Sequence, residues 1–368
     1  MTRRAAVPGR VHLVLPERFD DPMHPSGGNV YDRQVVSGLT RLGRQVLVLR
    51  APGAWPDPED SAREWLRRTL SRIPDEEVVL VDGLIASTSA AALCAQRDRL
   101  RLVVLLHMPL APHAPATVAA AERDALVAAR AVVVTSGWTR EQVTALHGLA
   151  ADRLSVAVPG VDPAPVASGT AAGARLLHVA PLVEHKGGDV LGSALGRLAA
   201  LDWQCTWVGD HGTDSPFADR VRDTTRSLPA RVDVRGVLTG ADLEQCWNAA
   251  DVLIVPSRCE TYGMVVTEAL AHGIPVIASD VGGLPEALGA GASGQRPGRL
   301  VPAGDVAALT GALRDWLADA HTRSTWRAAA IERRDGLPSW EDTVDVVAAT
   351  LDAARCLNPS ARGNVSRV

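Results

Sequence analysis

The sequence predicts an α/β protein in which two Rossmann-like domains, each with a parallel sheet, face each other across a cleft. Three observations support this prediction. Short apolar runs alternate with helix-length segments along the whole chain. This alternating series occurs twice, and one segment rich in Pro, Ala, Gly and Ser separates the two copies. The length of 368 residues also exceeds the size at which a single core usually keeps growing.

The first series defines an N-terminal domain over residues 1–160. Its strands are expected at Val11–Leu15, Val46–Leu49, Val78–Val81, Leu102–Leu106, Val132–Thr135 and Ser155–Val158. Its helices are expected at Val30–Leu42, Ser61–Arg72, Ala116–Ala129 and Thr139–His147. Because the strand runs are apolar at nearly every position, they fit parallel strands that are covered on both faces.

The second series defines a C-terminal domain over residues 175–338, after a linker over 161–174. Its strands are expected at Leu176–Val179, Cys205–Val208, Val232–Val234, Val252–Val255, Val276–Ala278 and Leu300–Val301. Its helices are expected at Gly188–Leu201, Ala241–Ala249, Gly263–Ala271 and Val306–Ala318. Residues 339–368 are expected to form a helix over Ser339–Ala354 that crosses back to the N-terminal domain, and then a tail.

Composition excludes several classes of protein. The net charge of −4 and the pI of about 6.2 argue against nucleic acid as a partner. The five cysteines are widely spaced and form no zinc or disulfide pattern. The basic start has no apolar segment after it, and no 18-residue apolar run occurs, so a cytoplasmic protein is expected. The oligomeric state is left open.

The chain contains a single lysine, Lys186, among 38 basic residues. It lies in the run Glu184-His185-Lys186-Gly187-Gly188, directly after an expected strand. Lysine is a compact, flexible point charge that suits a phosphate, whereas arginine is a planar fork. Chance survival at a solvated turn is the simpler explanation of this residue alone, and its neighbours favour a phosphate contact.

The strongest signal is the segment from Val255 to Leu270. A buried strand ends here, a polar loop follows, and a helix is expected to open near Tyr262–Gly263, where unpaired N–H groups favour an anion. Glu260 precedes this helix and Glu268 lies inside it. Two carboxylates on either side of an anion site suit a nucleotide-sugar, which has hydroxyls at both ends and phosphates between them.

Residues 251–286 resemble the signature of retaining glycosyltransferases with the GT-B fold, family 4 in particular. The resemblance rests on Glu260-x7-Glu268 and on the run from Gly273 to Glu286 that contains Gly-Gly-Leu-Pro-Glu. Further matches are Val158-Pro-Gly-Val-Asp162, His185-Lys186-Gly187, Arg235-Gly236-Val237, Ala250-Asp251 and Ser339-Trp340-Glu341. The resemblance is dense from about residue 132 onward and thinner before it.

The resemblance implies a set of site residues. Lys186, Glu260 and His107 would be the catalytic residues, with Glu260 and His107 facing the donor sugar. Glu268 would hold the ribose, backbone near Val237 would meet the base, and backbone N–H groups of the helix start would bind the diphosphate. The remaining donor-binding residues would be Gly27, Gly28, Thr261, Tyr262, Gly263, Met264 and Val265.

One position departs from the family pattern. A Gly-Arg pair usually precedes the lysine, and its arginine assists the lysine at the diphosphate, whereas this chain has Ala180-Pro181. Proline offers neither a charge nor an N–H group. Arg258 or Arg33 is the candidate replacement. Since no Asp-x-Asp follows a strand, neither a metal nor another cofactor is expected.

These observations favour a metal-independent, retaining glycosyltransferase of the hexosyltransferase type, which moves a sugar from a nucleotide-sugar to an unidentified acceptor. Two alternatives stay open: an epimerase or phosphorylase on the same fold, and a non-catalytic nucleotide-sugar-binding subunit. The helix around Trp65 and Leu66 carries four arginines, so it is either a solvated surface helix or a weak peripheral membrane contact.

Overall fold

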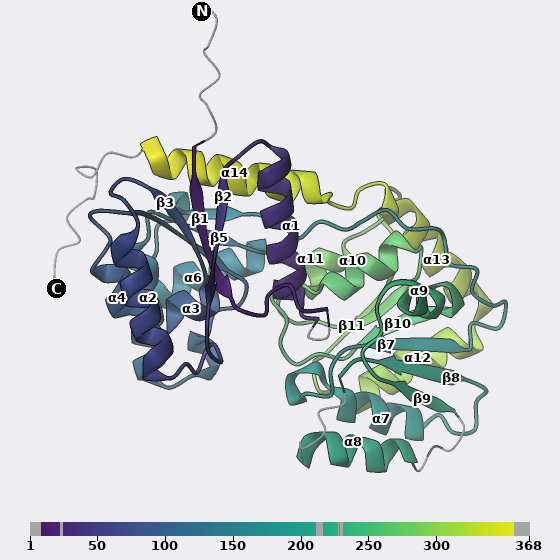
Figure 1. Cartoon of the computed structure of the whole chain (residues 1–368). Coiled ribbons are helices and arrows are strands. Elements are labelled where there is room, and N and C mark those ends of the chain that lie inside the picture. Colours follow the sequence, from purple (N-terminus) through teal and green to yellow (C-terminus); the bar gives the residue numbers. More distant parts are fainter. Residues whose placement is uncertain (1–8, 23–24, 211–215, 227, 229–230, 357–368) are drawn as a thin grey trace, which may run out of the picture. The chain divides into compact units, whose positions relative to one another are not determined.

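The computed structural model describes residues 9–22, 25–210, 216–226, 228 and 231–356. The chain divides into two compact units (Figure 1). The first comprises Met1–Pro159 and Trp340–Val368, and the second comprises Gly160–Ser339. The tail expected after the last helix lies outside the described residues.

The first unit is built on a six-stranded, fully parallel sheet with the order β2-β1-β3-β4-β5-β6. Chain order runs to one side from β1 and to the other side from β3, so the switch point of the topology lies between β1 and β3. The strands are β1 (Val11–Pro16), β2 (Val46–Ala51), β3 (Val78–Asp82), β4 (Arg101–Leu106), β5 (Ala131–Val134) and β6 (Leu154–Val156).

Helices connect these strands. They are α1 (Gly27–Arg41), α2 (Asp60–Arg72), α3 (Gly83–Ser87), α4 (Ala90–Cys94), α5 (Ala116–Ala128) and α6 (Gly137–His147), with 3-10 turns η1 (Ala111–His113) and η2 (Ala151–Arg153). The C-terminal helix α14 (Trp340–Cys356) also belongs to this unit and packs beside α1 (Figure 1). Arg44 anchors it through a bidentate pair with Asp352 at 2.7 Å, and Thr343 donates to Val158 O.

The second unit repeats this plan with the sheet order β12-β11-β10-β7-β8-β9, again parallel. Its switch point lies between β7 and β10. The strands are β7 (Arg175–Val179), β8 (Gln204–Val208), β9 (Val232–Arg235), β10 (Val252–Val255), β11 (Val276–Ser279) and β12 (Gly298–Val301).

The helical elements of the second unit are η3 (Glu184–Lys186), α7 (Gly188–Gly196), α8 (Pro216–Arg226), α9 (Gly240–Ala249), α10 (Met264–Ala271), α11 (Leu284–Leu288), α12 (Val306–Ala318) and α13 (Ala320–Arg334). Residues 160–174 lie within this unit. There Thr170 donates from its backbone N–H and its hydroxyl to Asp251, and Ser168 N–H donates to Asn248 Oδ1 at 3.1 Å.

The strands lie where the apolar runs predict them, with ends that differ by one or two residues. The helix predictions need correction in two respects. The helix expected over Gly188–Leu201 ends at Gly196, a poor helix former, and the chain continues in turns. Helices α8 and α13 and the short helices α3, α4 and α11 were not expected. In the polar helix α13, Asp319 caps the start, and the buried residues are Trp326, Ala329 and Ala330.

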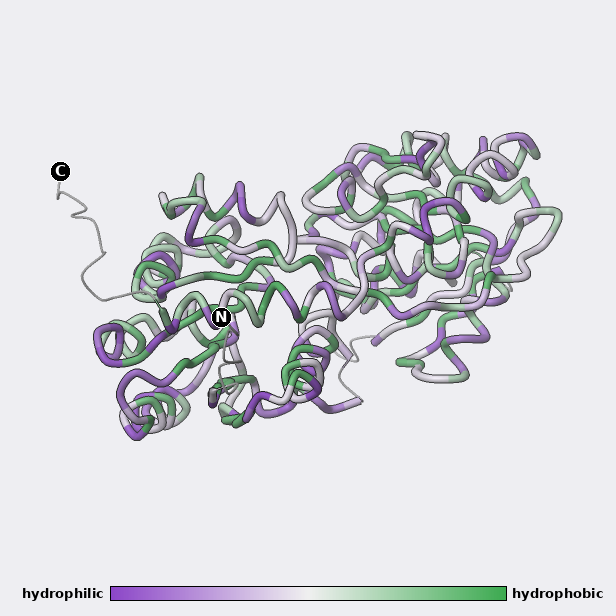
Figure 2. Tube along the Cα trace, turned by 90° about the horizontal axis from the view of Figure 1, so that it is seen from above, coloured by the Kyte–Doolittle hydropathy of each residue, from purple (hydrophilic) through white to green (hydrophobic). Residues whose placement is uncertain are grey.

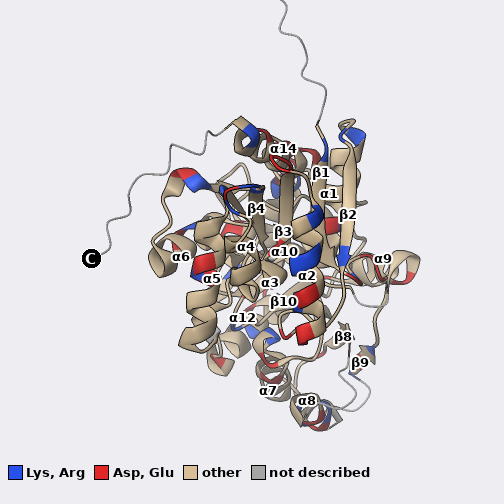
Figure 3. Cartoon of the chain, turned by 60° about the vertical axis from the view of Figure 1, so that its left-hand side comes forward, with Lys and Arg blue, Asp and Glu red and all other residues tan. Residues whose placement is uncertain are grey.

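Each sheet forms the centre of its own hydrophobic core, and Figure 2 shows green, hydrophobic stretches of the chain in both units. In the first unit Leu66 and Leu70 of α2 lie in this core, and Trp65 packs against it. Acidic and basic residues both lie on α2 (Figure 3), where Glu64 pairs with Arg67 and Arg68 at 2.7 and 2.6 Å. The apolar side of α2 is therefore occupied by the core, which argues against the membrane contact considered for it.

Within the described part of the chain, no helix has both the length and the hydropathy needed to cross a bilayer.

Candidate functional site

The switch point of the second unit brings two of the predicted residues together. Lys186 lies in the turn after β7, and Glu260 lies in the loop after β10, the neighbouring strand. The carboxyl ends of parallel strands open on one edge of a sheet, and ligands of such folds bind there. Lys186 Nζ lies 2.5 Å from Glu260 Oε1, and Ser257 Oγ donates to the same oxygen at 3.2 Å.

This ion pair is half-buried. The side chain of Lys186 is 23% exposed and that of Glu260 is 12% exposed. Screening by water is therefore reduced but present, and the pair holds one positive and one negative charge beside each other at the strand ends.

The two loops that carry this pair are joined to each other. Gly187 has a φ of 70°, and a Cβ at this position would collide with Pro256 O, so only glycine lets the turn lie against the loop. Arg258 N–H donates to His185 O at 2.7 Å. The Arg258 guanidinium donates to Glu184 O and forms a bidentate pair with Asp189, with distances of 2.6–2.8 Å.

These contacts correct the expectation for the arginine that is missing at Pro181. Asp189 and Glu184 O engage the Arg258 guanidinium, which braces the Lys186 turn from outside. Arg33, the other candidate, belongs to the first unit and donates to Phe19 O at 3.1 Å. Neither arginine therefore takes the place of the usual phosphate contact in this arrangement.

A glycine pair supports the Glu260 loop from the opposite side. Gly283 N–H donates to Glu260 O at 3.0 Å. At Gly282, whose φ is 62°, a Cβ would collide with the same carbonyl oxygen. The Gly-Gly of the signature is thus explained by close backbone packing, which holds the Glu260 loop against the segment after β11.

The start of α10 supplies unpaired donors at this edge. Gly263 has a φ of 96° and precedes the first helical residue, so the helix begins one residue later than predicted, at Met264. Val266 N–H already donates to Gly263 O, whereas the N–H groups of Gly263, Met264 and Val265 have no partner among the described residues. Such a helix start favours an anion.

Glu268 lies in the middle of α10 and is half-buried. Its carboxylate has no hydrogen-bond partner within the described ranges, although its backbone oxygen accepts from His272 Nδ1. Burial raises the pKa of Glu268, Asp162 adds to this effect, and His272 opposes it. The carboxylate is therefore free to accept hydrogen bonds from a ligand.

The other predicted residues of the second unit occupy different positions around this edge. Thr261 is half-buried and Tyr262 is buried, and burial raises the pKa of the Tyr262 hydroxyl. Val237 is half-buried in the loop after the edge strand β9. Since β8 separates β9 from β7, Val237 and Lys186 follow strands that are not neighbours in the sheet.

An aromatic pair lies beneath the Lys186 turn. His178 of β7 and Trp207 of β8 meet edge to face with ring centroids 4.6 Å apart, and His178 Nδ1 lies 2.8 Å from Ile254 O. Burial lowers the pKa of His178 to about 4, the hydrogen bond to Ile254 opposes this shift, and the charge of Lys186 adds to it. His178 is thus neutral near pH 7, and the positive charge of this region belongs to Lys186.

In the first unit, His107 follows β4 at the carboxyl edge of the sheet. Its Nε2 lies 2.9 Å from Asp32 Oδ1 and 3.6 Å from Asp82 Oδ2. Gly28, in the first turn of α1, lies over the ring: a Cβ there would be 3.4 Å from Cδ2. The structure thus brings Gly28 and His107 together, with the exposed Gly27 beside them.

Sequence reasoning missed both aspartates. Asp82 ends β3 beside the switch point, and its position directly after an apolar run could have signalled it. Asp32 lies in the second turn of α1, where nothing in the sequence distinguishes it from a surface acid. One carboxylate oxygen of each acid and one ring nitrogen of His107 lie within 4.8 Å of one another, close enough to share a proton or a cation.

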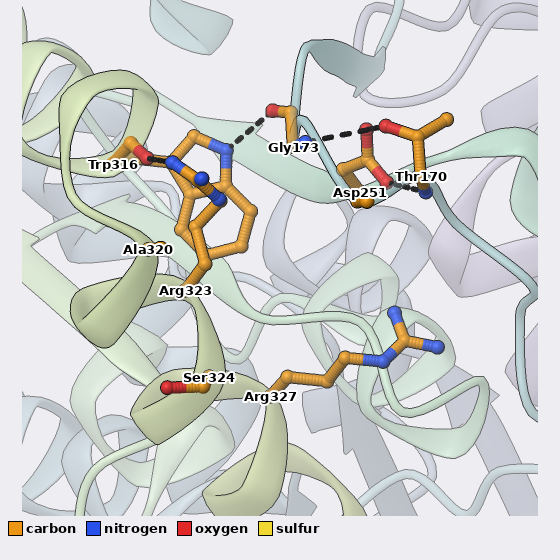
Figure 4. A pocket seen from close by; sticks show the side chains of 9 residues that line it. Thr170, Gly173, Asp251, Trp316, Ala320, Arg323, Ser324 and Arg327 are labelled. Carbon is orange, nitrogen blue, oxygen red and sulfur yellow. Dashed lines mark hydrogen bonds between the residues drawn. The ribbon is translucent and has the colours of Figure 1, made fainter.

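The second unit also contains a pocket of about 210 Å³ that Figure 4 shows from close by. Thr170, Asp251, Trp316, Arg323 and Arg327 contribute to its walls. Asp251 precedes β10, and Thr170 comes before β7, so the pocket lies at the amino ends of these strands. It is therefore at the opposite end of the sheet from Lys186 and Glu260.

Comparisons with known proteins agree with this geometry. Residues 24–165 match the family described as "Glycosyltransferase Family 4", and residues 173–319 match "Glycosyl transferases group 1". D-inositol 3-phosphate glycosyltransferase 1 of Catenulispora acidiphila is 29% identical, covering 83% of this chain and 74% of that protein. The enzyme of the same function from Kineococcus radiotolerans is 32% identical, covering 64% and 59%. Several of these curated relatives are thus matched over less than two thirds of their length.

Solved structures share the fold. Sucrose-phosphate synthase from Thermosynechococcus elongatus has a TM-score of 0.74 and 23% identity, covering 94% of this chain and 99% of that chain. Anabaena HepE, solved in complex with UDP and glucose, has a TM-score of 0.72 and 19% identity with the same coverage. Two Rossmann-like units of the GT-B type are the fold common to all of them.

Proposed function

Because this chain belongs to the family 4 glycosyltransferases, we propose that it transfers a sugar from a nucleotide-sugar to an acceptor, with retention of the anomeric configuration and without a metal ion. The second unit binds the donor, and the first unit contributes His107, Gly27 and Gly28 to substrate binding. The observation that carries this proposal is the convergence of Lys186, Glu260 and the start of α10 on one switch point.

The hydrogen-bond donors at this edge of the sheet suit a diphosphate. Three unpaired N–H groups at the start of α10 and the ammonium of Lys186 are all hydrogen-bond donors, and the helix dipole adds to their field. These groups stabilise the negative charge that grows on the departing diphosphate as the glycosidic bond breaks. The leaving phosphate, held on the same face of the sugar, then takes the proton of the incoming acceptor hydroxyl.

Glu260 has a second role in this scheme. In the free protein its carboxylate is bound by Lys186 and Ser257. The carboxylate therefore occupies the place beside the lysine that a phosphate group of the donor would take. When the donor arrives, the diphosphate replaces the carboxylate at Lys186, and Glu260 accepts hydrogen bonds from the sugar hydroxyls. This single exchange thus brings Lys186 to the diphosphate and frees Glu260 to bind the sugar.

The experiment that tests this function begins with a panel of nucleotide-sugars. A donor that binds the native state at 100 times its Kd adds about 2.7 kcal/mol to the free energy of unfolding, which a thermal shift detects. UDP-glucose belongs in the panel because HepE is solved with it, and D-inositol 3-phosphate belongs among the acceptors because relatives carry that name.

Turnover then separates the alternatives. Transfer to an acceptor with the donor's anomeric configuration, followed by NMR, supports the proposal. An inverted product contradicts retention, and turnover of the donor alone to an epimer identifies an epimerase. Cleavage by phosphate to a sugar phosphate identifies a phosphorylase. Tight donor binding without turnover on any acceptor favours a binding subunit.

A further inference from the structure

Two buried carboxylates meet one nitrogen of His107 in the first unit. Asp32 comes from α1, Asp82 from the end of β3, and His107 from the residue after β4. Both aspartates have only 2% of their side chains exposed. Buried carboxylates are costly unless they are paired, so this concentration of charge at the switch point calls for a function.

Both carboxylates lie near Nε2, and Asp82 is also held by other contacts. Asp82 caps α3: its Oδ1 accepts from Leu84 N–H at 2.8 Å and from Ile85 N–H at 3.4 Å. Its other oxygen, Oδ2, is left for His107. The hydrogen bond from Nε2 to Asp32 Oδ1 at 2.9 Å completes the arrangement.

The opposite ring nitrogen, Nδ1, is left for a ligand. No described residue bonds to it, and it is not among the buried atoms that lack a partner, so it is accessible to solvent; the side chain as a whole is 16% exposed. Tyr31 holds the ring from the side at a centroid distance of 5.1 Å, and its hydroxyl donates to Ala157 O at 2.9 Å. Gly28 covers the ring without filling the space at Nδ1.

We propose that Asp32 and Asp82 are positioning residues: they hold the proton on His107 Nε2, so that Nδ1 is presented to an oxygen atom of the substrate. A carboxylate at one ring nitrogen fixes the tautomer and the orientation of the other. This inference rests on the proposed function for the identity of the substrate, whereas the state of the ring can be tested without it.

The charges around the ring indicate its protonation state. Burial lowers the pKa of His107, but Asp32 and Asp82 more than offset this, and the net shift is upward. Burial raises the pKa of Asp82 to about 7, Asp32 adds to this, and His107 opposes it. The cluster therefore keeps a proton near neutral pH, and His107 Nδ1 is a hydrogen-bond donor when the ring is charged.

Two isosteric substitutions distinguish the effect of the carboxylate charge from the effect of the hydrogen-bond direction at Nε2. In Asp82→Asn the cap at Leu84 and Ile85 keeps the amide oxygen in place, so the amide N–H₂ faces Nε2 and opposes a proton there. In Asp32→Asn the amide can turn its oxygen toward Nε2, so only the charge is lost. Glu77→Gln is the matched control, because Glu77 lies 3.8 Å from His12 at the amino ends of β1 and β3.

The first readout is the NMR signal of the ring nitrogens in protein labelled with ¹⁵N-histidine, assigned with His107→Gln. The wild type should show a proton on Nε2 at pH 7, and Asp82→Asn should move the proton to Nδ1 or lower the pH at which the ring loses its charge. Glu77→Gln should leave the His107 signals unchanged. An unchanged ring in both Asp82→Asn and Asp32→Asn overturns the proposal, even if the chain has no transferase activity.

The second readout is turnover. Asp82→Asn should lower kcat by about 10–100-fold, the range typical for partners that orient a liganding histidine, with the donor KM changed far less. The same substitution in a His107→Gln background should have no further effect, because a positioning residue acts through the histidine. Full additivity of the two losses contradicts the proposal. A thermal unfolding midpoint for each variant excludes loss of the fold as the cause, and Asp32→Asn serves if Asp82→Asn does not fold.

A metal ion is the rival occupant of the cluster. Titration with Zn²⁺ or Mn²⁺, followed by calorimetry, should show no binding that Asp82→Asn abolishes. Stoichiometric binding that depends on Asp32, Asp82 and His107 would identify a cation site and refute the proton-holding role.

Discussion

Lys186 is the residue whose removal tests the reaction most directly. It is the single lysine of the chain, and the arginine that usually assists it is replaced by Pro181. Arg258 offers no substitute because Asp189 holds its guanidinium. We therefore expect Lys186→Ala to lower kcat by about 10²–10³, since the loss of one preorganised contact to a developing anion costs about 2.7–4 kcal/mol.

The structure separates this loss from a loss of stability. The Lys186–Glu260 pair is partly exposed, so removing it should change the free energy of unfolding by about 1 kcal/mol or less. Ser257 Oγ still donates to the remaining carboxylate. Because the catalytic effect exceeds the stability effect, Lys186→Ala should stay folded while turnover falls. Lys186→Arg should restore only part of the activity, because a planar fork places its charge differently.

The assay uses the fact that one lysine gives one signal. In protein labelled with ¹⁵N- and ¹³C-lysine, the single side-chain resonance should shift when the donor replaces Glu260 at the ammonium. Glu260→Gln should shift the same resonance in the free protein. Steady-state turnover of Lys186→Ala is measured beside Arg299→Ala, a control that removes a 2.6 Å pair with Asp315 elsewhere in the same unit. If the lysine resonance does not shift when the nucleotide-sugar donor is added, and Lys186→Ala keeps full turnover, the reasoning about this site is wrong.

Four further predictions concern the same unit. Glu260→Gln should bind a nucleoside diphosphate more tightly than the wild type in calorimetry, because the anion that competes for the lysine is gone, while kcat falls; weaker binding would contradict the exchange of partners. Glu268→Ala should weaken nucleoside diphosphate binding by about 1.5–3 kcal/mol through lost charged hydrogen bonds, and Glu332→Ala should not. Turnover should survive exhaustive chelation with EDTA, because α10 and Lys186 supply the positive field; full loss that Mg²⁺ or Mn²⁺ restores would refute this. Urea unfolding of the wild type should show stability that decreases from pH 6.5 toward pH 4, by at most about 3 kcal/mol, because the unfolded chain binds a proton at His178 that the folded one excludes. His178→Asn, which keeps a donor for Ile254 O, should lack this part of the slope.

The strands could be predicted because their apolar runs are continuous. Lys186 and Glu260 could be placed at one edge of the sheet because each lies in the loop after such a run, whereas their roles stay predictions. The sequence was not sufficient for α13, whose stability depends on an Asp319 cap and a few buried contacts instead of a strong apolar stripe. It also missed the role of Arg258. A guanidinium can bind a phosphate or a carboxylate equally well, and only the position of Asp189 decides between them.

The same limit explains why His107 was predicted and its partners were not. A histidine after a strand is visible in the sequence, whereas Asp32 and Asp82 are distant from it along the chain and meet it only because the order β1-β3-β4 places the ends of these strands side by side. The two units then follow one physical rule with opposite outcomes. At each switch point a basic side chain is paired with a carboxylate, but the Lys186–Glu260 pair is only half-buried, and we propose that a ligand replaces Glu260 there. The carboxylates at His107 are buried and cannot be exchanged, so there the ligand must come to the free nitrogen, Nδ1.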